Sequence, residues 1–168
     1  LEYSKEGDQN LTLKNKNFHL KTELTQIMIA MKSLVESNDN KLMVNINLKT
    51  DEEVYSDVAK IHQLFYNIIG NANKFTNKGT IEVNLNQTLV SDFELQFDVT
   101  VKDNGVGIAK DDLEKVFDSY YQSESASNQL LGVGLGLNLC KEIVELLEGK
   151  IAIDSIEKEG TKVDFHII

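Results

Sequence analysis

The stretch Asn67-Ile-Ile-Gly-Asn71-Ala-Asn-Lys74-Phe75 decides how this chain of 168 residues folds. Asn67, Asn71 and Lys74 are four and three residues apart, so they project from one strip of a single helix. An amide oxygen suits a magnesium ion that keeps water and phosphate in its shell, and a nearby ammonium can reach the same phosphates. The alternative is a solvated helix face with scattered amides, because the apolar residues between them would face a core in either case.

Around this stretch, apolar periodicity predicts the remaining elements. The helix is expected to begin after Asp57, a favourable N-cap residue, and to end at Asn77-Lys-Gly79. Other helices are expected over residues 20–35 and 134–147, with a short one around 111–116. Alternating apolar and polar residues predict strands over 11–14, 42–48, 80–89, 94–102, 150–156 and 161–168. We therefore expect an α+β fold, a two-layer α/β sandwich with a mixed sheet of about five strands on three main helices.

The composition excludes several classes of protein. With 41% hydrophobic and 26% charged residues, the chain fits one globular domain, and it contains no apolar run of the length that a membrane span needs. A net charge of −10 argues against nucleic acid or an anionic membrane as a partner. The single cysteine, Cys140, cannot form an internal disulfide and is expected on a helix face, which favours a reducing, cytoplasmic compartment.

A second candidate site begins at Asp103, which ends an alternating strand and is followed by Asn-Gly-Val-Gly-Ile108. A carboxylate at a strand end can accept hydrogens from an exocyclic amine, and Gly105 and Gly107 would let the backbone approach a flat ring. The alternative is an ordinary Asp-Asn-Gly turn, although such a turn needs only one glycine.

A third stretch, Leu131-Gly132-Val-Gly134-Leu-Gly136-Leu137, opens the last predicted helix. Glycines at a helix start expose unpaired N–H groups, which favour phosphate, whereas a flexible hinge is the alternative. The run is not a Rossmann fingerprint, because no parallel strand leads into it. It is not a Walker loop either, since no Lys-Ser/Thr pair follows Gly136.

In this order and spacing, the three stretches resemble the catalytic ATP-binding domain of sensor histidine kinases. These belong to the gyrase, Hsp90, histidine kinase and MutL (GHKL) superfamily, which implies its Bergerat ATP-binding fold. Residues 67–75 resemble the family's N box, 103–108 its first glycine box, 117–122 its phenylalanine box and 132–137 its second glycine box. Gly160-Thr161 resembles the short third box before the last strand.

The resemblance implies roles for individual residues. Asn71 would ligate Mg²⁺, Lys74 would contact phosphate, and Asp103 would hold the adenine amine with support from Thr161. Asn67 would order the metal side and form the expected catalytic pair with Lys74. The expected ATP-binding residues are Asn71, Lys74, Phe75, Asp103, Gly105, Gly107, Ile108, Gly132, Gly134, Leu135, Gly136, Leu137 and Thr161.

The resemblance also implies a division of the chain and a set of partners. Residues 1–18 would contain the end of a dimerisation helix and a linker strand, and residues 19–168 the catalytic domain. The partners would be the dimerisation and phosphoacceptor helices of the parent kinase and a downstream response-regulator receiver domain. The fragment itself is expected to be monomeric and to make no direct membrane contact, whether or not its parent is membrane-anchored.

The three histidines, His19, His62 and His166, lack the acidic residue and proline that usually follow a phosphoacceptor histidine. We interpret all three as structural and expect the acceptor upstream of Leu1. Position 67 resembles a general-base glutamate in the gyrase and Hsp90 branches, but Asn67 has no basic lone pair. Neutral imidazole is already nucleophilic, so we expect phosphoryl transfer from Mg-ATP to a histidine on a separate helical domain.

Three departures from the family pattern keep alternatives open. Residues 116–136, the expected lid, contain no Lys or Arg, and Val133 stands where the family usually has Thr. Asn73 stands where an aliphatic residue is usual, and the sequence offers no physical reason for it. A degenerate nucleotide-binding or interaction module without phosphotransfer, and a GHKL ATPase, therefore remain as alternatives.

Overall fold

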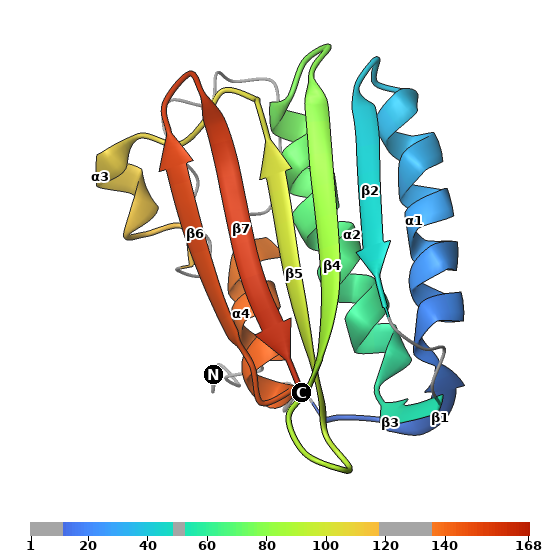
Figure 1. The fold of residues 1–168 in the computed structure, drawn as a ribbon. Helices are drawn as coiled ribbons and strands as arrows, with labels where there is room; N and C mark the ends of the chain where they lie inside the picture. Colours follow the sequence, from blue (N-terminus) through green and yellow to red (C-terminus); the bar gives the residue numbers. More distant parts are fainter. Residues whose placement is uncertain (1–11, 49–52, 118–135) are drawn as a thin grey trace, which may run out of the picture.

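The computed structural model describes residues 12–48, 53–117 and 136–168, which form a five-stranded sheet with helices on one face (Figure 1). The strands of this sheet are β2 (Lys41–Asn47), β4 (Thr80–Leu89), β5 (Leu95–Asp103), β6 (Lys150–Ile156) and β7 (Gly160–Ile167). Their order is β2-β4-β5-β7-β6, in which β2 pairs in parallel with β4 and every other neighbouring pair is antiparallel.

Three long helices cover one face of the sheet (Figure 1). They are α1 (Leu20–Glu36), α2 (Val58–Phe75) and α4 (Gly136–Leu146), and the one-turn helix α3 (Lys110–Leu113) lies beside β6. Alternate residues of the central strands, such as Val83 on β4 and Val99 on β5, are buried beneath these helices. The predicted α+β fold with a mixed sheet of about five strands and three main helices is thus confirmed.

Strand register gathers several predicted site residues at one end of the sheet. Ile81, near the start of β4, pairs with Asp103 at the end of β5, and Lys41 at the start of β2 pairs with Thr80. The β6–β7 turn lies at the same end, because Ser155 pairs with Thr161 next to it. We call this the site end; the β4–β5 hairpin lies at the opposite end (Figure 1).

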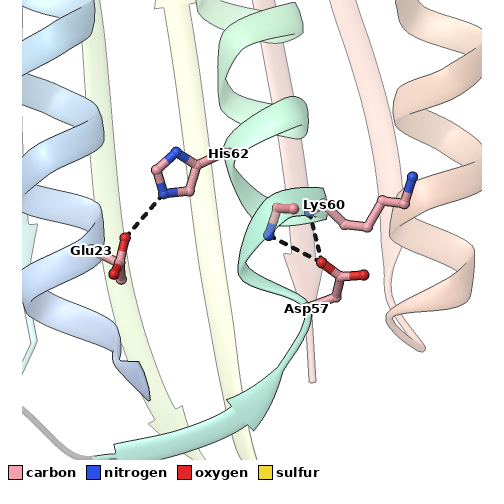
Figure 2. Close-up of polar contacts among 5 residues, drawn as sticks. Glu23, Asp57, Lys60 and His62 are labelled. Atoms are coloured by element: carbon pink, nitrogen blue, oxygen red, sulfur yellow. Dashed lines mark hydrogen bonds and ion pairs between the residues drawn. The ribbon is translucent and has the colours of Figure 1, made fainter. Parts of the chain in front are cut away.

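The central helix α2 begins where the sequence predicts, because Asp57 caps it (Figure 2). Its Oδ1 accepts hydrogen bonds from the backbone N–H groups of Ala59 at 3.0 Å and Lys60 at 3.1 Å, and its Oδ2 accepts one from Lys14 at 2.7 Å. Burial opposes ionisation of Asp57, but these donors outweigh it and hold the pKa of its carboxyl below the usual value. The helix ends at Phe75, since Thr76 is extended.

Helix α2 is also joined to α1 by a side-chain contact between His62 Nε2 and Glu23 Oε2 at 3.1 Å (Figure 2). His19 is the residue before α1, and His166 lies on β7 opposite Lys150, away from the site end. These placements agree with structural roles for the three histidines. The described helices contain no apolar segment of the length that a bilayer crossing requires.

One predicted strand is wrong, and two observed strands were not predicted. Residues 12–15 are not a strand, so the expected strand over 11–14 is wrong for its described part, and Leu11 lies outside the described residues. Instead, β1 (Lys16–His19) pairs with β3 (Glu53–Ser56) in a separate two-stranded sheet. Each of these strands directs one apolar side chain toward the core, Phe18 on β1 and Val54 on β3. Neither sequence therefore shows a repeated alternation of apolar and polar residues.

Candidate functional site

Asp103 is buried at the end of β5, with 7% of its surface exposed. Its Oδ1 accepts hydrogen bonds from the backbone N–H groups of Gly105 at 2.8 Å and Thr161 at 3.3 Å. Burial raises the pKa of the Asp103 carboxyl, although these backbone donors and the nearby Thr76 side chain oppose that effect. Both of these bonds go to Oδ1, so they orient the carboxylate without using Oδ2.

The turn after Asp103 needs both of its glycines. A Cβ on Gly105 would lie 2.2 Å from the Phe75 carbonyl oxygen, and one on Gly107, where φ is +67°, would lie 2.1 Å from that of Ile156. The Val106 N–H also donates to the Phe75 carbonyl at 3.1 Å. The turn is therefore packed between the end of α2 and β6, which goes beyond an ordinary Asp-Asn-Gly turn. Among the described residues, the glycines make room for protein backbone; their approach to a ligand ring stays a prediction.

Ser155, which the sequence analysis missed, connects two predicted site residues. Its Oγ accepts from the Ile108 backbone N–H at 2.8 Å, donates to the Gly160 carbonyl at 2.8 Å and lies 2.9 Å from Thr161 Oγ1. Thr161 thus supports Asp103 through its backbone N–H, while its hydroxyl is held by Ser155. A sequence signal existed, because Ser155 occupies the partly buried position that Ile151 and Ile153 hold earlier on β6.

The strip of polar residues on α2 faces the start of α4. A Cβ on Gly136 would lie 3.4 Å from Asn71 Nδ2, so the first described residue of α4 lies against the Asn71 amide. One turn away on each helix, the Asn67 amide lies beside the Cys140 thiol. These two contacts show that α2 and α4 run antiparallel. Burial raises the pKa of that thiol to about 12, with a smaller opposing effect from Asn67.

The two proposed catalytic side chains have different surroundings. Asn67 Nδ2 is buried and makes no hydrogen bond within the described part of the chain. Lys74 Nζ lies over the Phe75 ring, 5.1 Å from its centroid. Leu137 is partly buried on α4. Gly132, Gly134, Leu135 and the phenylalanine box beyond Phe117 lie outside the described residues.

The donor set on α2 fits a magnesium ion that arrives with phosphates. Residues 12–48, 53–117 and 136–168 contain no cluster of three or more His, Cys, Asp or Glu side chains placed to hold a metal. A hard cation there would rely on the Asn71 amide oxygen, with ligand phosphates and water completing its shell. Mg²⁺ binds in this way, through few protein ligands and several waters, so the residues present fit it.

Comparisons with known proteins agree on one family and one fold. Residues 56–168 match the family described as histidine kinase-, DNA gyrase B- and HSP90-like ATPase. The signal transduction histidine-protein kinase BarA of Escherichia coli strain K12 is 30% identical over 170 residues, which cover 99% of this chain. This chain spans only 18% of the length of BarA.

Two solved structures share the fold. The catalytic domain of histidine kinase ThkA superposes with a TM-score of 0.72 and 21% identity, over 92% of this chain and 95% of that one. Full-length ShkA, determined in complex with AMPPNP, gives a TM-score of 0.75 and 19% identity, over 94% of this chain and 31% of ShkA. At these identities the superpositions show the arrangement of helices and strands, and the family match comes from the sequence.

Proposed function

This chain belongs to the family of histidine kinase-, DNA gyrase B- and HSP90-like ATPases, and we propose that it is the catalytic domain of a sensor histidine kinase. In this proposal it binds Mg-ATP and transfers the γ-phosphate to a histidine on a separate dimerisation domain. The observation that carries the proposal is the buried Asp103 carboxylate, oriented through one oxygen, at the same end of the fold as the Asn71 and Lys74 strip.

Asp103 would recognise the adenine ring. Its oriented carboxylate accepts hydrogen bonds only, so it would pair with the exocyclic amine of adenine and would repel a carbonyl at the same ring position. Burial strengthens that choice, because a mismatched ligand would leave the second carboxylate oxygen without water and without a donor from the ligand. AMPPNP in the ShkA complex supports an adenine nucleotide as the ligand.

Asn71 and Lys74 would hold the triphosphate. The Asn71 oxygen would bind Mg²⁺, and the Lys74 ammonium would contact the phosphates from the same helix strip. Bound Mg²⁺ supplies neutralisation of the charge that develops on the transferred phosphoryl group. Gly136 lies against Asn71, and together with the other glycines of the second box it would let the backbone approach the phosphates.

The surroundings of Asn67 favour transfer over hydrolysis. A GHKL ATPase would need a general base here to activate water, but an amide has no basic lone pair. The neighbouring Cys140 thiol, with a pKa of about 12, stays protonated at neutral pH and cannot replace it. An imidazole acceptor needs no such base, since its neutral form is nucleophilic, so positioning and charge neutralisation suffice.

The proposal assigns residues 19–168 to the catalytic domain and residues 1–18 to the end of a dimerisation helix and its linker. Its partners would be the phosphoacceptor helices of the parent protein and a downstream receiver domain, and it would act in the cytoplasm. The similarity to BarA, a histidine-protein kinase more than five times longer, supports a parent protein with further domains.

The parent protein incubated with γ-labelled ATP and Mg²⁺ tests the proposal. We expect protein-bound phosphate that is labile in acid and stable in base, as phosphohistidine is, and that is strongly reduced by Asn71→Ala. Release of inorganic phosphate without labelled protein would favour an ATPase. ATP binding without either product would indicate a degenerate module, and both results would overturn the kinase proposal.

A further inference from the structure

Asn40, in the turn between α1 and β2, has a buried side chain that connects to the end of α2. Its Nδ2 donates to the Asn73 carbonyl at 3.2 Å, to Asn73 Oδ1 at 2.9 Å and to the Thr76 carbonyl at 2.9 Å. Its Oδ1 accepts from the Gly79 backbone N–H at 2.9 Å. We call Asn40 and Asn73 the amide clamp; Asn40 is 4% exposed and Asn73 is 4% exposed.

The amide clamp gives a physical reason for Asn73. Besides pairing with Asn40, its Nδ2 lies 3.5 Å from the Leu34 carbonyl oxygen near the end of α1. An aliphatic residue at position 73 would remove both contacts and leave buried polar groups less well satisfied. The clamp therefore joins the end of α1 and the start of β2 to the end of α2, which is 33 residues beyond Asn40 in the sequence.

The segment held by the clamp, residues 75–80, packs against the turn after Asp103, and we call it the wall of the candidate adenine site. On its other side, Asn104 Oδ1 accepts from the Thr80 backbone N–H at 2.8 Å. Gly105 leaves no room for a Cβ beside Phe75 and Thr76, so the Asp103 turn rests directly on the end of α2. The Thr76 hydroxyl is buried close to the Asp103 carboxylate. Residues 75–80 are thus held by Asn40 from one side and by the Asp103 turn from the other.

We propose that Asn40 and Asn73 are positioning residues that set the separation between the two halves of the nucleotide site. Asn71 and Lys74 lie in the last turns of α2, and Asp103 lies across the wall formed by residues 75–80. One ATP molecule must reach both halves, so a small shift of the end of α2 would weaken simultaneous contact with adenine and phosphates. This inference rests on the proposed function, because it concerns how ATP is held.

The proposal differs from a purely stabilising role in one measurable way. If the clamp sets the separation, its loss should weaken ATP, which spans both halves, more than adenosine, which occupies one. A variant that is merely less stable should bind both ligands with unchanged relative affinity wherever it is folded. The ratio of the ATP and adenosine dissociation constants is therefore the readout that stability alone would not move.

The experiment compares variants of this chain by isothermal titration calorimetry with Mg-ATP and with adenosine. Asn40→Ala removes the amide, and Asn73→Leu replaces the second amide with a side chain of similar size. Asn47→Ala is the matched control, because Asn47 makes a single exposed contact with Asn86 on the open face of the sheet. Leu20→Ala, at the far end of α1, controls for lost stability. Thermal unfolding fixes a temperature at which every variant is folded.

We expect Asn40→Ala to weaken Mg-ATP about tenfold, as for the loss of one buried hydrogen bond, and adenosine much less. Asn73→Leu should show a smaller loss in the same direction, since Asn40 keeps its bonds to the Asn73 and Thr76 carbonyls. Both controls should bind as the unmodified chain does.

An unchanged affinity ratio in Asn40→Ala and Asn73→Leu would overturn the positioning role. If Asn40→Ala does not fold, two single variants decide the question by the same affinity ratio. They are Asn73→Leu and Asn40→Asp, which removes the donor group of Asn40 and keeps its size. The proposed function fails separately, and this inference with it, if the unmodified chain binds neither ligand.

Discussion

On the adenine side of the candidate site, nearly every polar group is held by another part of the chain. Asp103 accepts from Gly105 and Thr161, Ser155 joins Ile108 to Thr161, and the amide clamp fixes the wall behind them. On the phosphate side, Asn67, Asn71 and Lys74 share one helix strip, and Asn67 Nδ2 is buried without a hydrogen bond in the described residues. In the proposed site, the adenine half is already ordered by the protein, whereas the phosphate half would also need the phosphates and a metal ion.

This difference would explain how an acidic domain binds a triphosphate, as we propose. A net charge of −10 opposes anions at long range, but in the proposed site a metal ion, one lysine and a helix start would act within a few ångströms of the phosphates. Changes on the adenine side should therefore weaken nucleotide binding with or without Mg²⁺. Changes on the phosphate side should remove only the part of the nucleotide affinity that depends on Mg²⁺.

The largest effect is expected from Asn71→Ala on the phosphate side. Loss of the metal ligand should lower phosphoryl transfer in the parent protein on the order of 100-fold or more, because charge neutralisation by the metal is lost. Binding of ATP in EDTA should stay unchanged. Asn84→Ala, on the open face of β4, is the control. Labelling that survives Asn71→Ala would contradict the metal assignment.

The next effect is expected from Asp103→Asn on the adenine side. Asn can still accept from Gly105 and Thr161, but its amide group would meet the adenine amine as a second donor. Nucleotide affinity should fall roughly 10- to 100-fold, and equally in Mg²⁺ and in EDTA. Asp98→Asn, on the same strand but facing away from the helices, is the matched control. A loss of nucleotide affinity that is seen in Mg²⁺ but not in EDTA would show that the two halves of the site do not contribute independently.

The pH dependence of Asp103 should distinguish binding from stability. Because its pKa is raised in the folded state, protonation favours folding, and this contribution is complete below 3.8 and is lost as pH rises through the folded pKa. Asp103→Asn should therefore keep or raise the melting temperature at pH 7 while it weakens ATP. As pH falls, protonation of Asp103 should lower the ATP affinity. This decrease should begin at a higher pH than it would for an aspartate with the ordinary pKa. A lower melting temperature at pH 7 would contradict this sign.

The smallest effect on binding is expected at the far end of α2. Asp57→Ala removes the N-cap and should lower the free energy of unfolding by about 1 kcal/mol, with ATP affinity unchanged. The sign of its pH dependence is opposite to that of Asp103. Its pKa is lowered, so its contribution is present above 3.8 and is lost as pH falls through the folded pKa. Denaturant titration at pH 7 and at pH 3 measures both the loss of unfolding free energy and its pH dependence.

The sequence predicted the sheet and the three main helices because their apolar periods are long and regular. It placed Asp57 at the start of α2 and Asp103 at the end of β5, as the structure does. It missed β1 and β3, since each of these four-residue strands offers one core side chain and is defined only by its partner. Local sequence patterns predict a helix or strand where buried positions recur several times along that element.

The site residues that the sequence did not reveal depend instead on contacts between segments that are distant in the sequence. Asn40 and Asn73 are 33 positions apart, and neither shows its role until the fold brings α1, β2 and α2 together. Likewise, Asn67 meets the Cys140 thiol only because α4 packs against α2. Ser155 was the exception, because a hydroxyl in an inward position of β6 departs from the alternation. The roles assigned to Asn67, Asn71, Lys74 and Asp103 stay predictions until a ligand is bound.

Calorimetric titration of this chain with ATP, in Mg²⁺ and then in EDTA, tests the central claim most directly, with adenosine as the ligand that reaches only one half. We expect Mg²⁺ to strengthen ATP binding at least about tenfold, as for a charge-neutralising metal contact, and to leave the affinity for adenosine unchanged. Equal ATP affinity in Mg²⁺ and in EDTA would contradict it.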